Sequence, residues 1–258
     1  MKPEQQRAWF ALGLGPRWVA RGTTASVATV TEERAPESVQ AVPMPALPAI
    51  AGSEAVPPSV ASMDWSLLRE AVSQCTACAL SRSRRNTVFG VGPTSARWVI
   101  IGEAPGAEED ARGEPFVGQA GKLLDAMLGA IGLNRERDVF ITNVLKCRPP
   151  GNRNPEPDEV RCCSPYLHRQ LALLQPEGIL LMGRFAAQAV LDTEASIASL
   201  RGRVHRLKGG GSDRPVVVTY HPAYLLRNLP DKAKAWADLC LARSVFGQDR
   251  DAVQPADQ

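Results

Sequence analysis

The sequence of 258 residues lacks a long apolar run, a histidine-rich segment and a large excess of either charge. No apolar stretch approaches the ~20 residues that a membrane-spanning helix needs, so we expect no membrane association. The first residues also lack the apolar core of a secretory signal, which predicts a cytoplasmic protein. Lysine and arginine number 30 against 27 acidic residues, a net charge of +3, so total charge does not indicate a nucleic-acid partner.

Histidine occurs only three times, whereas cysteine occurs six times. In a cytoplasmic protein, cysteines favour metal binding or redox chemistry over disulfides. Cys75 and Cys78 form a C-x-x-C pair, and Cys147 and Cys163 follow further along the chain. With no histidine nearby, these thiolates predict an all-cysteine site, either an iron–sulfur cluster or a tetrahedral zinc. Four buried free cysteines are the alternative.

The N-terminal quarter of the chain differs in composition from the rest. Residues 1–22 carry aromatic and aliphatic side chains at roughly helical spacing, which indicates either a frayed helix or a docking peptide. This segment loosely resembles the N-terminal peptide of the psi subunit of bacterial DNA polymerase III, so the expected partner is a replication or repair protein. Residues 23–62 are rich in proline and alanine and predict a disordered linker. We expect the folded domain over 63–247 and a flexible tail over 248–258.

Four short β-rich runs predict the strands of one sheet: Trp98–Ile101, Val139–Val144, Ile179–Met182 and Val216–Tyr220. Each run is unbroken rather than alternating, which is typical of parallel strands buried on both faces. Helical patterns lie between the runs, although Pro165 interrupts one of them. The alternation predicts an α/β fold, a three-layer α/β/α sandwich around a mainly parallel four-stranded sheet. We expect a monomer.

The segment after the first predicted strand carries the chemistry. A Gly/Pro turn contains Glu103, and Glu109 and the isolated aromatic Phe116 follow before the next helical pattern. Open α/β sheets place their active sites where a buried strand ends in such a glycine-rich loop.

Four motifs then occur in a fixed order: GEAPG at 102–106, PFVG at 115–118, TNVLKCRPP at 142–150 and HPAYLLR at 221–227. Together they resemble the family 4 uracil-DNA glycosylases, the iron–sulfur enzymes of the uracil-DNA glycosylase superfamily. The resemblance covers about residues 75–243. It implies a uracil-DNA glycosylase-like fold and an enzyme of base excision repair. Such an enzyme flips uracil out of single- or double-stranded DNA and hydrolyses its N-glycosidic bond, leaving an abasic site.

The resemblance also implies a [4Fe–4S] cluster on four cysteines, which by position are Cys75, Cys78, Cys147 and Cys163. The family places its fourth ligand four residues after a glutamate, here Glu159, which selects Cys163 over the neighbouring Cys162. The implied role of the cluster is structural. Its location near Arg148 and Arg153 indicates that it holds a DNA-facing loop.

Two residues are implied to bind the flipped base. Phe116 supplies the aromatic face on which uracil stacks. Asn143 reads the O4/N3 edge, because an amide can accept from N3–H and donate to O4. Cytosine presents the reverse pattern, and buried mismatched polar groups reject it.

The remaining implied roles concern bond cleavage. His221 is the donor that stabilises the negative charge developing on uracil O2. Glu103, ranked above Glu109, is the candidate carboxylate for the sugar cation and the attacking water. The best-known branch of the superfamily has an aspartate base where this chain has Ala104, so the backbone at Ala104 is an alternative for positioning the water.

The loop after His221 is implied to enter the DNA minor groove, where an apolar wedge beside a cation fills the gap left by the flipped base. Tyr224, Leu226 and Arg227 are the residues concerned. A non-catalytic DNA-binding module of the same fold, linked to replication or repair, is the alternative function, since the aspartate is absent.

Overall fold

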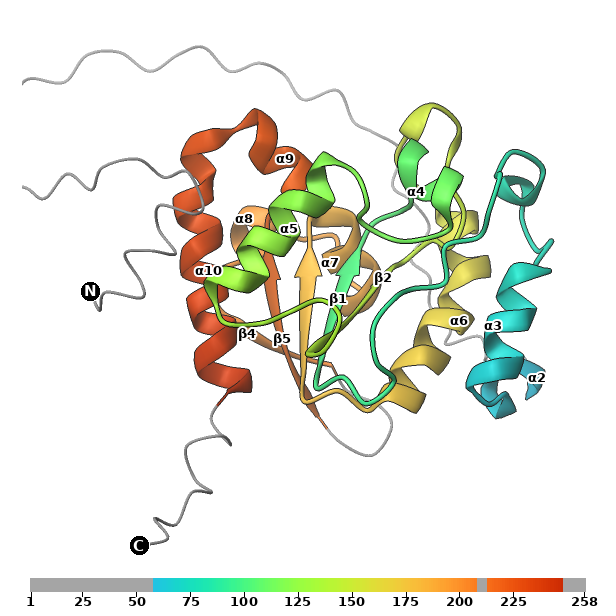
Figure 1. Cartoon of the computed structure of the whole chain (residues 1–258), viewed down its shortest axis with the longest axis horizontal. Helices are drawn as coiled ribbons and strands as arrows, with labels where there is room; N and C mark the ends of the chain where they lie inside the picture. Colours follow the sequence, from blue (N-terminus) through green and yellow to red (C-terminus); the bar gives the residue numbers. More distant parts are fainter. Residues whose placement is uncertain (1–57, 208–212, 248–258) are drawn as a thin grey trace, which may run out of the picture. The chain divides into compact units, whose positions relative to one another are not determined.

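A computed structural model of the chain describes residues 58–207 and 213–247 (Figure 1). The predicted docking peptide, most of the predicted linker and the predicted tail lie outside the described residues. The end of that linker range is helix α2 (Pro58–Ser62), and Val60 on this helix is buried in the core. The prediction of a linker to residue 62 was therefore wrong at its C-terminal end, because an apolar side chain docks there.

The described elements alternate strand and helix. The strands are β1 (Trp98–Gly102), β2 (Val139–Asn143), β3 (Gly178–Met182), β4 (Val204–Leu207) and β5 (Arg214–Thr219). The further α-helices are α3 (Trp65–Ser73), α4 (Ala107–Arg112), α5 (Gln119–Ala130), α6 (Pro157–Leu174), α7 (Arg184–Leu191), α8 (Ile197–Leu200), α9 (Pro222–Arg227) and α10 (Lys232–Phe246). Short 3-10 helices occupy Ala79–Arg82, Pro150–Asn152 and Leu229–Asp231. None of the described helices is long and apolar enough to cross a membrane.

The strands form one sheet in the order β2-β1-β3-β5-β4. The first four are parallel, and β4 pairs antiparallel with β5 at the edge. The predicted strand count of four was therefore low by one. Strand β4 alternates exposed and half-buried residues over only four positions, and such a short edge strand gives little apolar signal in the sequence.

Helices cover both faces of the sheet (Figure 1). Val99 and Ile101 of β1 belong to a core shared with α3, α6, α7 and α8, whereas Trp98 and Ile100 belong to a core shared with α5, α9 and α10. Successive strand residues face opposite sides of a sheet, so an unbroken apolar run serves both cores. The predicted three-layer α/β/α sandwich is confirmed.

Two helices illustrate how local sequence acts. The Asp64 side chain accepts a hydrogen bond from the Leu67 amide at 2.9 Å and caps α3. Helix α6, however, continues through Pro165 to Leu174. A proline removes one backbone donor and usually kinks a helix, but here Leu167 and Leu171 beyond it are buried in the core and offset this cost.

Candidate active site and cysteine cavity

The carboxyl ends of three parallel strands gather the predicted site residues. Gly102 at the end of β1 pairs with Asn143 at the end of β2. Strand β5 ends at Thr219, and His221 follows as the N-cap of α9. Ligands of open α/β sheets bind beyond these strand ends.

Gly102 has no side chain where two other side chains need the space. A Cβ built on Gly102 would lie 2.3 Å from Asn143 Oδ1 and 2.6 Å from Phe116 Cζ. The Phe116 ring in turn stacks on His221, with ring centroids 5.4 Å apart and an interplanar angle of 27°. Gly102, Phe116, Asn143 and His221 thus lie together, and we call them the strand-end site.

Asn143 carries an unusual polar atom. The residue is 2% exposed, and its side-chain oxygen Oδ1 has no hydrogen-bond partner in the described part of the chain. A buried amide oxygen without a partner lowers the stability of the fold by roughly 1–3 kcal/mol. Such an atom calls for an explanation, and a ligand that donates a hydrogen bond to it would provide one. The backbone carbonyl of Asn143, in contrast, accepts a hydrogen bond from Lys146 Nζ at 2.8 Å, which fixes the strand end.

His221 is arranged as a neutral donor. Its Nδ1 accepts a hydrogen bond from the Ala223 amide at 3.2 Å, which leaves the proton on Nε2. Burial lowers the pKa of His221 to about 4, an effect that Glu109 opposes and Arg227 reinforces. At neutral pH the imidazole is therefore uncharged and offers Nε2–H as a donor.

Glu103 follows directly after β1. Burial raises the pKa of its carboxyl group to about 7, and nearby Arg184 only partly opposes this shift. No hydrogen-bond partner holds the carboxylate within the described residues, and the Glu103 backbone carbonyl accepts from the Leu145 amide at 3.1 Å. The backbone of Glu103 is therefore held in place, while its carboxyl group is available to bind water or a proton. The half-buried side chain of Ala104 packs against the core.

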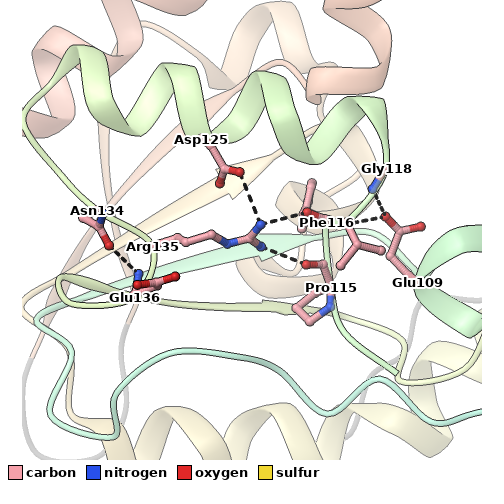
Figure 2. Close-up of polar contacts among 9 residues, drawn as sticks. Glu109, Pro115, Phe116, Gly118, Asp125, Asn134, Arg135 and Glu136 are labelled. Atoms are coloured by element: carbon pink, nitrogen blue, oxygen red, sulfur yellow. Dashed lines mark hydrogen bonds and ion pairs between the residues drawn. The ribbon is translucent and has the colours of Figure 1, made fainter. Parts of the chain in front are cut away.

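Glu109 has different surroundings. One carboxylate oxygen accepts from the amides of Val117 and Gly118 at 3.0 and 3.2 Å, and Figure 2 shows the contact with Gly118. The other oxygen accepts from the Gly106 amide at 3.1 Å. Both oxygens are therefore engaged by the loop itself. These contacts favour a positioning role, and the predicted role of Glu109 toward water stays a prediction.

The α9 segment presents part of the predicted wedge. Leu226 is 42% exposed and Arg227 is also exposed, whereas the Tyr224 hydroxyl donates to Asp231 Oδ2 at 2.6 Å. Leu229, which the sequence analysis did not single out, is 57% exposed on the same segment. A single leucine after a turn carries no sequence signal that separates a wedge from a core residue.

The two predicted DNA-facing arginines differ in their contacts. Arg148 Nε donates to Asn152 Oδ1 at 2.7 Å. Arg153 makes two hydrogen bonds to the Glu159 carboxylate, at 2.9 and 2.6 Å, and so ties its loop to α6. Their roles toward DNA stay predictions.

The four predicted cysteine ligands line one pocket, which we call the cysteine cavity. They come from three segments, namely the C-x-x-C turn after α3, the segment after β2, and α6. Cys162 lines the same cavity, so the choice between Cys162 and Cys163 stays open, whereas Cys240 is not among the lining residues. Within the described residues, no three side chains of the ligating types are arranged to hold a single metal ion.

Hydrogen-bond donors point at two of the sulfurs. The backbone amide of Lys146 donates to Cys163 Sγ and Arg84 Nη1 donates to Cys147 Sγ, each at 3.2 Å. Burial raises the pKa of the Cys163 thiol to about 12, and it also raises the pKa of Cys78 and Cys147. A cation or a metal centre is therefore needed to stabilise thiolates in this cavity.

A three-layer α/β/α fold with a cluster of polar and aromatic side chains at its strand ends agrees with the sequence comparisons. The family model of the uracil DNA glycosylase superfamily matches residues 89–240, and the chain belongs to this superfamily. The match includes all four residues of the strand-end site. The predicted resemblance is confirmed at this level.

Within the superfamily, the chain is similar to curated type-4 uracil-DNA glycosylases. It is 50% identical to that of Archaeoglobus fulgidus over 164 residues, which is 62% of this chain and 81% of the relative. It is 39% identical to that of Pyrobaculum aerophilum over 183 residues, 69% of this chain and 93% of the relative. It is 44% identical to that of Thermotoga maritima over 163 residues, 63% of this chain and 83% of the relative.

Proposed function

We propose that this protein is a uracil-DNA glycosylase of DNA repair, a monofunctional hydrolase of the N-glycosidic bond. The observation that carries the proposal is the strand-end site, where the unpaired buried Oδ1 of Asn143 lies beside the Phe116 ring and the neutral His221. The similarity to type-4 uracil-DNA glycosylases supports the same conclusion.

Base recognition follows from the groups present. A uracil extruded from DNA stacks on Phe116 and presents its N3–H to Asn143 Oδ1, which removes the cost of the unpaired oxygen. The amide nitrogen of Asn143 then donates to O4. Cytosine has an acceptor at N3 and a donor at the exocyclic nitrogen, so both contacts become repulsive.

Bond cleavage needs stabilisation of opposite charges on the two fragments. His221 Nε2–H donates to uracil O2, where negative charge develops as the N-glycosidic bond breaks. Because the imidazole is neutral, it stabilises the leaving anion without protonating it completely. Glu103, as a carboxylate, stabilises the positive charge on the sugar and orients the water that attacks C1′.

The cysteine cavity fits an iron–sulfur cluster. Its lining thiols come from three segments that no disulfide joins, and donors from Lys146 and Arg84 face the sulfurs. Cys75, Cys78, Cys147 and Cys163 would hold a [4Fe–4S] cluster whose ligands bind separate iron atoms, so they need not converge on one ion. When bound, the cluster supplies a structural cross-link, which would fix the segment that follows Asn143.

Uracil release from oligonucleotides tests the proposal. Full-length, cluster-replete protein should release free uracil from single- or double-stranded DNA containing one uracil, and should leave the matching cytosine substrate intact. Asn143→Ala should slow release by roughly 10²-fold or more, because one buried recognition group is lost. Binding of uracil-containing DNA without any release would instead favour the non-catalytic module and refute the proposal.

A further inference from the structure

The aromatic wall of the strand-end site has a strained backbone. Phe116 is 4% exposed and has a φ of 53°, in the left-handed region that bulky residues rarely adopt. Such a conformation persists only where surrounding contacts over-determine it. Its ring position depends on this backbone, because the peptide on either side sets the direction in which the side chain leaves the loop.

Arg135, from the connection between α5 and β2, holds that backbone. Its Nη1 donates to the Phe116 carbonyl at 3.0 Å, and its Nη2 donates to the Pro115 carbonyl at 2.9 Å (Figure 2). Asp125 on α5 lies 3.4 Å from Nη1 and orients the guanidinium. The planar fork of arginine can bind two consecutive carbonyls at once, which a lysine ammonium does not reproduce.

The same segment is held from two other directions. Glu109 accepts from the amides of Val117 and Gly118, immediately after Phe116. A Cβ on Gly121 would lie only 1.8 Å from the Phe116 carbonyl oxygen, so the backbone of α5 closes directly on this peptide. In residues 115–118, Arg135 thus binds the first two carbonyls and Glu109 binds the last two amides.

We propose that Arg135 is a positioning residue of the strand-end site, which sets the plane of the Phe116 ring for stacking on the extruded base. This inference rests on the proposed function of the site. Within the described residues, Arg135 makes no hydrogen bond or ion pair with Asn143, His221 or Glu103, so it acts through the Pro115–Phe116 backbone. Its removal should therefore weaken base binding and base release through displacement of the Phe116 ring.

The test compares Arg135→Ala with Arg137→Ala in the full-length, cluster-replete protein. Arg137 is the matched control, because it lies in the same loop, its side chain is 75% exposed, and it pairs with the adjacent Asp138. We expect Arg135→Ala to slow single-turnover uracil release about tenfold or more and to weaken binding of free uracil, measured by calorimetry, by a similar factor. Arg137→Ala should stay within about twofold of wild type.

A double mutant separates positioning from general structural support. Phe116→Ala alone should impair release, and adding Arg135→Ala should reduce it by less than about twofold more, since the ring through which Arg135 acts is gone. Guanidinium ion should partly restore Arg135→Ala but not Phe116→Ala. If Arg135→Ala fails to fold, Arg135→Lys carries the comparison, with an intermediate loss expected.

Each outcome is informative. Additive losses in the double mutant, or an Arg135 variant that matches Arg137→Ala, overturn the inference while leaving the proposed function intact. A wild-type protein that binds free uracil but releases none refutes the proposed function, and the uracil affinities of the variants still test Arg135. A wild-type protein that neither binds nor releases uracil overturns both.

Discussion

Substituting Gly102 by alanine adds one methyl group at the centre of the strand-end site. The new Cβ would lie 2.3 Å from Asn143 Oδ1, and 2.6 and 2.8 Å from two carbons of the Phe116 ring. Ordinary contact begins at 3.4 Å, so the amide oxygen must retreat by about 1.1 Å and the ring by about 0.8 Å. Both groups that we propose to bind the base are therefore displaced by one methyl group.

The size of this displacement sets the expected effect. Misplacement of a binding group by about 1 Å can cost roughly 10²-fold in rate, and we expect a loss of that size for Gly102→Ala. The stability cost should be smaller. Overpacking by one methyl group costs about 1–3 kcal/mol, which for a domain of this size lowers Tm by a few to about 12 °C. The protein should therefore remain folded at 25 °C while losing most of its activity.

Single-turnover uracil release measures the activity and thermal unfolding measures the stability. Gly129→Ala is the matched control, because Gly129 is an exposed helical glycine of α5 whose Cβ would meet nothing within 4 Å. That substitution should leave release unchanged and should stabilise the protein by roughly 0.5–1 kcal/mol. If Gly102→Ala releases uracil at a rate within about threefold of wild type, the site accommodates the added methyl group, and the proposed placement of Asn143 and Phe116 is incorrect.

Two other predictions concern ionisation and the cysteines. Because the raised pKa of Glu103 is about 7, the rate of uracil release should increase as pH rises through that value. Glu103→Gln should abolish this increase. His221, with its pKa of about 4, cannot produce a change in rate near pH 7. In the same variant, stability should no longer fall between pH 4.5 and about 7, the window in which the folded wild type holds a proton that the unfolded chain has lost. Purified protein should contain about four iron and four sulfide ions per chain, which Cys163→Ser should reduce and Cys240→Ser should not. Stoichiometric zinc without sulfide, or equal iron loss in both variants, would contradict the cluster assignment.

Much of the fold could be predicted because apolar runs report burial directly. The predicted strand Trp98–Ile101 matches β1 to within one residue, and the other three predicted strands lie within two residues of those observed. These runs are buried on both faces, so apolar residues dominate them. The edge strand β4 could not be found in this way, because it has only four residues, no fully buried position, and two polar residues between its apolar ends.

The contacts of Arg135 with the backbone of Pro115 and Phe116 could not be predicted either, for a different reason. Arg135 lies in a charged stretch, LNRERD, that reads as a solvated turn. Its two carbonyl partners precede it by 19 and 20 residues, and backbone carbonyls have no sequence identity. Only the tertiary structure distinguishes Arg135 from Arg137, two residues away and largely exposed.

The same limit applies to the two glutamates of the active-site loop. A carboxylate in an active-site loop has two physical uses, to act on the substrate or to bind backbone amides, and residue type alone does not separate them. Here Glu103 has no hydrogen-bond partner in the described region and a raised pKa, whereas Glu109 satisfies three amides. The structure therefore gives two similar carboxylates different surroundings, which favour Glu103 for the reaction and Glu109 for support of the loop.

Lys146 connects the strand-end site to the cysteine cavity. Lys146 is 1% exposed, and its ammonium group donates to the Asn143 carbonyl while its backbone amide donates to Cys163 Sγ. Burial lowers the pKa of this lysine to about 8, and the neighbouring cysteines oppose the shift. A buried cation is costly unless anionic groups lie nearby, and thiolates of a bound cluster are such groups. A cluster bound in the cavity would therefore stabilise the lysine that fixes Asn143. This gives a physical reason why the proposed cluster ligand Cys147 and the proposed recognition residue Asn143 stand four positions apart in one motif.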